Sequence, residues 1–508
     1  MITDLIHLIV GHNAVQKNLL ALAVVIPLLI GPVCVITRVP NLAWFLALLS
    51  TGISLAIAVL LQIDMEPGVR LTYYLGNWPP PWGIEFVLDG ASSITLLVMS
   101  ALAFLSTLSA KDLVATEIAQ ADIGKFYGAW LLACGGLFGL VLTADAFNLF
   151  VFLEISALSS VILISMGAGR DRRALVAGYN YLLLGAVGAT FYVIGVGFVY
   201  AMTGTLNMAD LASRIPNSSS DTVVFVGFAF MVAGILVKAA VFPVHVWLPA
   251  AYAYAPSSVS TLLAAIATKA ALYVLARVLF TIFSGLSPFV SLALDNVIIP
   301  LAVAGVFIGT VMAIYESDIK KLLAQSSVAQ IGYIALSFSL ATKAGISAGF
   351  VHIGNHAIIK GGLFMAVASF VISLGMRTNL KELRGIGRRM PITGVAFLIC
   401  GLSLAGLPLT AGFMSKLFII RAILETGSFI VLSLVLISSV LSLVYLWKIF
   451  EIMWMQPAPM KSPVLVEKPS VYLPLWFIAI VNIWLGVDAD WLITASQTAA
   501  VALIGADG

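Results

Sequence analysis

Apolar stretches long enough to cross a lipid bilayer follow one another along almost the whole chain. A membrane-spanning helix needs about 20 mainly apolar residues, and 61% of the 508 residues are hydrophobic while only 10% are charged. So few polar residues could not cover the apolar surface of a water-soluble domain. We therefore predict an all-α membrane protein whose single polytopic domain, residues 1–508, meets the lipid bilayer through about fourteen transmembrane helices. The predicted spans are residues 18–37, 41–63, 85–110, 127–144, 146–166, 174–201, 222–249, 257–283, 287–314, 322–340, 346–375, 393–420, 427–450 and 472–494.

Prolines interrupt two of these spans. Pro243 lies in the seventh span and Pro408 in the twelfth, and each removes a helix hydrogen bond. Irregular backbone at membrane depth is tolerated only where protein covers it or where it lines a wet cavity. Since the two broken spans are five spans apart, the pattern predicts two inverted five-helix repeats of the kind found in transporters. The predicted repeats are residues 127–283, helices 4 to 8, and residues 287–450, helices 9 to 13.

Four lysines and one glutamate lie well inside otherwise apolar predicted spans. A charge held at membrane depth is costly, and such residues usually mark the path of an ion or a proton. This pattern indicates a protein that handles protons within the membrane. The five are Glu154, Lys238, Lys269, Lys360 and Lys416.

Each buried charge has a structural alternative. A lysine near a helix end can extend its amine to the membrane surface. Lys269, however, lies about twelve residues into its span, which is roughly 18 Å of helix. Glu154 has bulky apolar neighbours on both sides, so it is expected to be neutral or paired with a cation. Lys238 is the natural candidate for that partner.

Two histidines share one face of the eleventh span with a lysine. His352, His356 and Lys360 are spaced i, i+4 and i+8, which places them along one side of a helix. An imidazole titrates near neutrality and can both accept and release a proton. The alternatives are that His352 is a satisfied core histidine and that Lys360 only donates to backbone carbonyls. His245, just after Pro243, is expected to stabilise the broken helix end rather than to bind a metal.

No motif for a metal or a cofactor is present in the sequence. The three cysteines, Cys34, Cys134 and Cys400, are far apart and form no C-x-x-C motif, so iron–sulfur and structural zinc sites have no support. A haem would need two imidazoles from facing helices, whereas His352 and His356 lie on one. We expect no cofactor and no metal, and the net charge of +3 gives no indication of a nucleic-acid partner.

The distribution of basic residues predicts the orientation of the chain. Sixteen of the 26 lysines and arginines fall in the odd-numbered loops between predicted spans, and four are the intramembrane lysines. Loops rich in lysine and arginine face the cytoplasm. We therefore predict a multi-pass protein of the cell membrane with both termini on the non-cytoplasmic side. The six basic residues assigned to the even loops and the tails are Lys17, Arg70, Arg214, Arg277, Lys343 and Arg421.

Three runs of residues resemble one family of membrane proteins. They are residues 144–154 (ADAFNLFVFLE), 237–260 (VKAAVFPVHVWLPAAYAYAPSSVS) and 318–333 (DIKKLLAQSSVAQIGY). They are similar to the antiporter-like membrane subunits shared by respiratory complex I, membrane-bound hydrogenases and Mrp cation/proton antiporters. The run at residues 74–84, followed by Asp89, is most similar to the D-type chain of the Mrp Na⁺/H⁺ antiporters.

The resemblance implies a role for each buried charge. Glu154 and Lys238 would be the coupled pair of helices five and seven, and Lys269 the central lysine of helix eight. His356 would be the histidine of helix eleven, and Lys416 the terminal charged residue of helix twelve. The supporting residues would be His352, Lys360, His245, Pro243 and Pro408.

Two functions follow from the resemblance. The first is a proton-translocating subunit of a multi-subunit Mrp-type antiporter, in which protons moving through this chain drive Na⁺ or another cation outward together with other membrane subunits. Such a chain is a secondary transporter rather than an enzyme. The alternative is the proton-pumping arm of a redox-driven complex, an NADH–quinone oxidoreductase or a membrane-bound hydrogenase. A haem- or quinone-binding electron carrier is weakly supported, because the ligands are missing.

Overall fold

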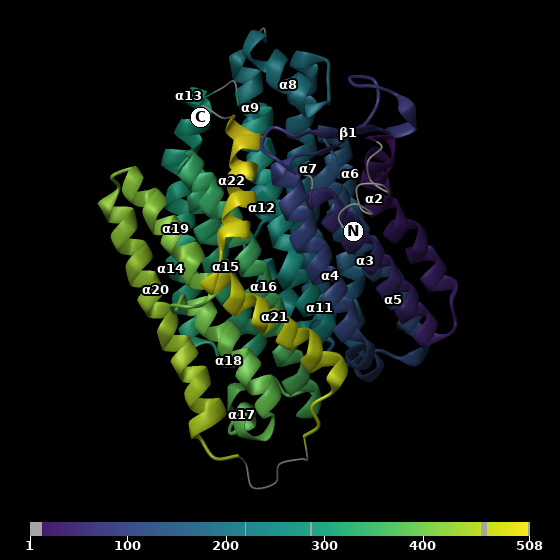
Figure 1. Cartoon of the computed structure of the whole chain (residues 1–508), viewed down its shortest axis with the longest axis vertical. Coiled ribbons are helices and arrows are strands. Elements are labelled where there is room, and N and C mark those ends of the chain that lie inside the picture. The colour runs from purple at the N-terminus through teal and green to yellow at the C-terminus, as the bar shows by residue number, and fades with distance from the viewer. Residues whose placement is uncertain (1–12, 64, 219, 285–286, 459–464, 506–508) are drawn as a thin grey trace, which may run out of the picture.

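The protein is nearly all helical, as predicted. The computed structural model describes residues 13–63, 65–218, 220–284, 287–458 and 465–505. Most of the long helices run along the long axis of the molecule, and α20 lies at one edge (Figure 1). The α-helices are α2 (Asn13–Ile36), α3 (Pro40–Ile63), α4 (Gly90–Glu117), α5 (Ile123–Leu142), α6 (Ala146–Ser165), α7 (Arg173–Thr203), α8 (Met208–Arg214), α9 (Asp221–Lys238), α10 (Trp247–Tyr254), α11 (Ser257–Leu262), α12 (Thr268–Arg277), α13 (Ser287–Ala293), α14 (Ile299–Tyr315), α15 (Ile319–Ser339), α16 (Lys343–Ser373), α17 (Ile386–Arg389), α18 (Pro391–Ala405), α19 (Ala411–Glu425), α20 (Phe429–Phe450), α21 (Pro469–Val487) and α22 (Asp490–Ile504).

Short elements complete the fold. The strands β1 (Leu71–Tyr74) and β2 (Glu85–Leu88) form an antiparallel hairpin in which Leu71 pairs with Leu88. The hairpin lies at the same end of the molecule as α8 and α13, and α17 lies at the opposite end (Figure 1). The short helical turns are η1 (Leu75–Asn77), η2 (Gln120–Asp122), η3 (Met166–Gly169), η4 (Ile215–Asn217), η5 (Leu263–Ala267), η6 (Val278–Ile282), η7 (Leu294–Ile298), η8 (Leu380–Leu383) and η9 (Glu451–Met455).

Twelve helices of the described residues are long and apolar enough to cross a membrane. The count of about fourteen is therefore not confirmed as uninterrupted helices. One reason is that the twelfth predicted span is divided into α18 and α19, each of 15 residues. The other is that α15 has the length, 21 residues, but carries Lys320, Lys321 and Gln325 among its apolar residues.

Both predicted breaks are present. Helix α9 ends at Lys238 and α10 begins at Trp247, whose indole N–H donates to the carbonyl of Val237 over 3.0 Å. This bond ties the first residue of α10 to the last turn of α9. Helix α18 ends just before Gly406, whose φ is +87°, a conformation that glycine adopts without strain.

A third break was not predicted. The last predicted span, residues 472–494, is wrong in its bounds, because α21 ends at Val487 and α22 begins at Asp490. Helix α21 runs obliquely and α22 continues toward the end that carries the hairpin (Figure 1). The amide of Asn482 on α21 accepts from the backbone N–H of Ala411 at 3.3 Å. The break between α21 and α22 therefore abuts the break between α18 and α19.

The third predicted span is also wrong at its start. Residues 85–88 form strand β2, and α4 begins at Gly90. Asp89 determines this boundary, because its carboxylate accepts from the backbone N–H groups of Ala91 and Ser92, each at 3.0 Å. An aspartate in this position is a favoured N-cap.

The eighth span is one long helix with two π-helical turns. The π turns η5 and η6 flank α12 on either side. π turns are rare in proteins and occur frequently at functional sites. Lys269 lies in the first turn of α12.

Candidate functional site

The predicted lysines lie inside the protein. Lys269 is 1% exposed, Lys360 is 0% exposed and Lys416 is 5% exposed, and the side chain of Lys238 is 10% exposed. The alternative in which these amines extend to the membrane surface is therefore wrong. Charges buried this deeply need partners or a role.

Glu154 and Lys238 face each other between α6 and α9. The Nζ atom of Lys238 lies 3.6 Å from Oε1 of Glu154, which confirms the predicted pairing. Neither atom makes a hydrogen bond to any other described residue. On the neighbouring helix α7, a Cβ added to Gly185 would lie 3.5 Å from this Nζ, so glycine leaves room around the amine. The two atoms are therefore close without being held by a third described residue.

Lys269 is bound to its own helix. Its ammonium donates to the carbonyl of Ala264 in the π turn η5, and neighbouring Leu263 accepts from the hydroxyl of Tyr252 at 3.0 Å. The irregular turn thus provides acceptors that an ordinary α-helix keeps for its own backbone. Lys269 is thus held by one backbone carbonyl rather than by a carboxylate.

His352 has the geometry of a satisfied core histidine. Its Nδ1 lies 2.9 Å from the hydroxyl of Ser415 and its Nε2 lies 3.0 Å from Oε1 of Gln330. The ring of His356 stacks nearly parallel to it, with ring centroids 6.0 Å apart. Both ring nitrogens of His356 are buried and make no hydrogen bond to any described residue. Of the two histidines, His356 is the one whose ring nitrogens have no hydrogen-bond partner among the described residues.

Lys360 bonds to the adjacent helix α15. Its ammonium donates to the carbonyl of Leu323 at 2.8 Å and to the hydroxyl of Ser326 at 2.5 Å, as the carbonyl-bonding alternative proposed. Helix α16 thus contacts α15 at Lys360 and also packs against the π turn η5, which precedes Lys269.

Lys416 closes the end of α18. Its ammonium donates to the carbonyl of Ala405 at 2.7 Å and lies 5.6 Å from the centre of the Tyr333 ring. A cation is stabilised at the C-terminus of a helix and over an aromatic face. Because Ser415 is next to it in the chain and contacts His352, α19 connects the terminal lysine to the histidine face of α16.

His245 and the two prolines lie in the helix breaks. Pro243 and His245 fall between α9 and α10, and Pro408 falls between α18 and α19. The ring of His245 lies 5.4 Å from that of Phe242. No group of three or more histidine, cysteine, aspartate or glutamate residues in the described part of the chain is placed to hold a metal ion.

Sequence reasoning missed Lys320. We assigned it to a loop, but it lies in the first turn of α15, is 1% exposed and donates to the carbonyl of Ala255 at 3.2 Å. The next residue, Lys321, lines a polar cleft of about 350 Å³ together with Glu117 and Asp318. The available signal was its spacing, because residues 320 and 323 lie on one face of a helix.

Sequence reasoning also misplaced Arg277. It is counted above with the basic residues of the loops, although the predicted span 257–283 contains it; in the structure it ends α12, is 8% exposed and pairs with Asp89. Burial by itself raises the pKa of Asp89, but the charge of Arg277 and hydrogen bonds from Arg277 and Ser92 hold that pKa below its usual range. Arg277 and Asp89 thus form an ion pair within the protein.

A known family matches the central part of the chain. The model of the family described as NADH:quinone oxidoreductase/Mrp antiporter, TM, matches residues 143–442. This match includes every residue of the site from Glu154 to Lys416. The chain belongs to this family.

Relatives within the family come from two kinds of complex. The N-type chain of the NADH-quinone oxidoreductase of Desulforudis audaxviator is 40% identical over 423 residues, 83% of this chain and 82% of the relative. The D-type chain of the Na⁺/H⁺ antiporter of Bacillus subtilis is 28% identical over 492 residues, 96% of this chain and 98% of the relative. A chain in the structure of the Mrp complex from Dietzia sp. DQ12-45-1b has 29% identity and a TM-score of 0.88, covering 96% of this chain and 98% of its own length. The family and the twelve apolar helices make this a multi-pass membrane protein.

Proposed function

We propose that this chain is the proton-translocating subunit of a multi-subunit Mrp-type antiporter that exchanges protons for Na⁺ or another cation. The observation that carries the proposal is the series of buried ionisable side chains from Glu154 to Lys416, two of which lie beside helix breaks. Similarity along nearly the whole chain to the D-type chain of an antiporter and to a chain of an Mrp complex supports the same assignment. Its partners are then the other membrane subunits of such a complex.

The Glu154–Lys238 pair provides the switching step of this proposal. A carboxylate that approaches an ammonium group stabilises its charged form, and one that withdraws favours release of the proton. The separation of 3.6 Å, with no other described partner on either atom, leaves both side chains free to make this movement. A proton released by Lys238 would pass to Lys269.

The second half of the path continues through α16 and α19. His356 would take the proton from Lys269 and pass it toward Lys416, because its ring nitrogens are not engaged by described residues. His352 and Lys360 would support the path by orienting their neighbours, and His245, Pro243 and Pro408 by maintaining the helix breaks. We place the paths in two inverted repeats, residues 127–283 and 287–450.

The membrane setting is part of the proposal. Large apolar side chains, among them Ile36, Ile430 and Leu473, are exposed on the outer helices, as expected of a surface that meets a lipid bilayer. The end that carries α17, with Arg388 and Arg389, would face the cytoplasm. Both termini would then lie on the non-cytoplasmic side of the cell membrane.

A second function is favoured by one observation. The relative with 40% identity is named as part of an NADH-quinone oxidoreductase, and the same side chains would serve as the proton-pumping arm of a redox-driven complex. The proteins that co-purify with the chain distinguish the two functions. Small antiporter subunits support the first, whereas iron–sulfur or NADH-binding subunits support the second.

Substitution of the lysines in the assembled complex tests the proposal. In reconstituted vesicles, Lys238→Ala, Lys269→Ala and Lys416→Ala should each abolish the dissipation of a pH gradient that addition of Na⁺ produces, while the complex still assembles. Lys125→Ala is the matched control, because its side chain is 64% exposed at the start of α5. Retained exchange in all three buried-lysine variants would refute the assignment.

A further inference from the structure

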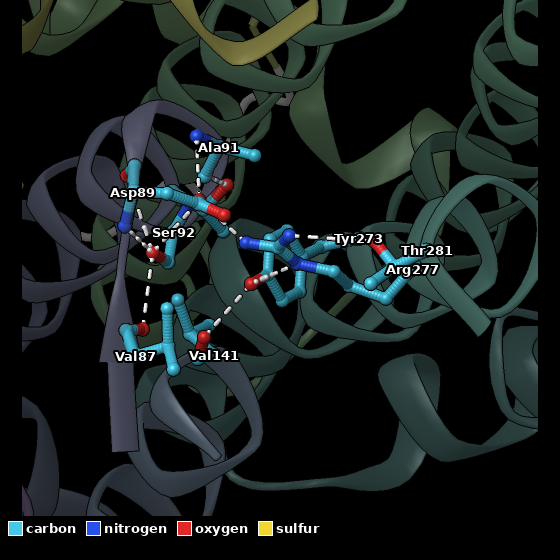
Figure 2. Close-up of polar contacts among 9 residues, drawn as sticks. Val87, Asp89, Ala91, Ser92, Val141, Tyr273, Arg277 and Thr281 are labelled. Carbon is cyan, nitrogen blue, oxygen red and sulfur yellow. Dashed lines mark hydrogen bonds and ion pairs between the residues drawn. The ribbon is translucent and has the colours of Figure 1, made fainter. Parts of the chain in front are cut away.

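Arg277 connects a carboxylate and a phenol at the end of the eighth span. Its Nη2 atom donates to Oδ1 of Asp89 at 2.5 Å, and its Nε atom donates to the hydroxyl of Tyr273 at 2.8 Å. That hydroxyl in turn donates to the carbonyl of Val141 at 2.9 Å. Figure 2 shows the guanidinium lying between Asp89 and Tyr273. The hydroxyl of Tyr273 therefore donates its proton to Val141 and accepts a hydrogen bond from Arg277.

Asp89 is fixed in place by α4. Its carboxylate caps that helix, and the hydroxyl of Ser92 donates to the carboxylate at 3.1 Å. The side chains of Arg277 and Asp89 are only 9% and 12% exposed. The guanidinium is thus held by a rigid anchor that belongs to a different span.

The pair lies in line with the central lysine. Lys269, Tyr273 and Arg277 are spaced i, i+4 and i+8 on α12, so they follow one face of the helix over about 12 Å. Tyr273 is the intermediate position on this face. A path from Lys269 toward this end of the molecule therefore meets Tyr273 first and Arg277 second.

A cleft lies immediately beyond these side chains. Its volume is about 280 Å³, and it is lined by Asp89, Tyr273, Arg277 and Thr281 among others. Arg70, next to the hairpin, also lines it. The cleft near Lys321 lies at the other end of α4, where Glu117 is, and the 28 residues of α4 separate the two ends by roughly 42 Å.

We propose that Arg277, held by Asp89, is the gate that closes the proton path at the hairpin end, and that Tyr273 is the group it locks. The inference rests on the proposed function, since it assumes that protons reach Lys269. The guanidinium occupies the position from which the hydroxyl of Tyr273 could accept a proton. While Arg277 and Val141 engage the hydroxyl of Tyr273, that hydroxyl cannot relay a proton. When Arg277 withdraws, Tyr273 takes one proton from the Lys269 side and gives its own to the cleft.

The flanking π turns supply a means of opening. A π turn contains one more residue than an α turn, and the mid-helix placement of such turns is typical of functional sites. Moving the irregularity by one position along the helix rotates the side chains of α12 relative to α4. Such a rotation separates Arg277 from Asp89 without unfolding either span.

The competing interpretation is that the ion pair only joins α4 to α12. Removing one partner of a buried pair is strongly destabilising, whereas replacing both with neutral groups is often tolerated. The double variant Asp89→Asn/Arg277→Gln is therefore the main test, and Arg277→Gln alone is the second. If Arg277 is a gate, losing the pair raises the passive flux of protons. If the pair is only structural, the flux of an assembled variant stays unchanged.

The experiment measures the passive proton flux into vesicles that contain the whole complex, with neither a transported cation nor an electron donor present. The double variant should raise this flux by about tenfold, and Arg277→Lys, which keeps a charge opposite Asp89, should stay near the wild-type value. Adding Lys269→Ala to the double variant should return the flux to background. An unchanged flux in an assembled double variant overturns the gate, as does a leak that persists without Lys269.

This readout also separates the two proposals. If the double variant shows no added proton leak while exchange by the complex still requires Lys269, the gate is refuted and the proposed function stands. Normal exchange after Lys269→Ala, together with a leak in the double variant, has the opposite meaning. It refutes the proposed function, and the gate then depends on whether Lys269→Ala abolishes the leak of the double variant.

Discussion

The ammonium of Lys416 donates to the carbonyl of Ala405, the last residue of α18, at 2.7 Å. A lysine of one half-helix thus caps the C-terminus of the other across the break at Gly406. A Cβ added to Gly406 would lie 2.7 Å from Cδ of this lysine, so the glycine makes room for the side chain as well as the turn. The charge is therefore tied directly to the geometry of the broken helix.

Lys416→Gln should separate the structural role of this side chain from its role in transport. The amide of glutamine can still donate to the carbonyl of Ala405, but it carries no exchangeable charge. We expect assembly to be unchanged and Na⁺-dependent exchange to fall by about 100-fold, the size of effect that proton-transfer groups commonly show. Exchange is measured from the decay of a pH gradient in vesicles, and a wild-type rate would contradict the role of Lys416.

Glu154→Gln should be as severe as loss of Lys238. Glutamine has nearly the shape of glutamate, but it does not stabilise an ammonium 3.6 Å away as a carboxylate does. Glu154→Asp keeps the charge and should retain partial exchange. The control is Asp210→Asn, which removes a carboxylate from a partly exposed pair with Arg214. If Glu154→Gln and Asp210→Asn exchange equally fast, the switching role is wrong.

The two histidines should respond in opposite ways to substitution by glutamine. His352 makes two buried contacts, to Ser415 and Gln330, and loss of such bonds costs about 1–3 kcal/mol each. His352→Gln should therefore lower the thermal stability of the purified complex more than His356→Gln does. His356→Gln should reduce exchange more strongly, because it removes the ring whose nitrogens are not bound to described residues. Equal effects on both readouts would contradict the distinction.

The sequence predicted the parts of the fold that the bilayer itself dictates. Apolar length determines where spans occur, and Pro243 and Pro408 indicated both breaks because proline cannot continue a helix. The break between α21 and α22 has no proline within it. This break packs against the twelfth span. Such contacts between distant segments cannot be read from a single sequence.

Some charged residues of the site were likewise predictable from the sequence, and others were not. Lys238, Lys269 and Lys416 stand out because each is surrounded by apolar sequence. Lys320 and Arg277 lie at helix ends, where hydropathy does not distinguish a side chain that faces water from one that faces protein. Only the packing of α15 on the loop at Ala255, and of α12 on Asp89, shows that both are buried.

Gly486→Ala should damage the contact between the two abutting breaks. A Cβ on Gly486 would lie 2.4 Å from the backbone of Leu409 and Thr410, a distance at which backbone must shift. The shift would also disturb the bond from Ala411 to Asn482 and, through α19, the position of Lys416. We expect a lower melting temperature and slower exchange.

The matched control for this substitution is Gly197→Ala in the second half of α7. No atom lies within 4 Å of a Cβ at Gly197, and alanine is a better helix former than glycine by about 1 kcal/mol. This variant should be neutral or slightly stabilising in a thermal denaturation experiment, with normal exchange. Because both substitutions add one methyl group to a helix, a difference between them isolates the close contact. If both variants behave alike, the junction of the twelfth and fourteenth spans does not position Lys416.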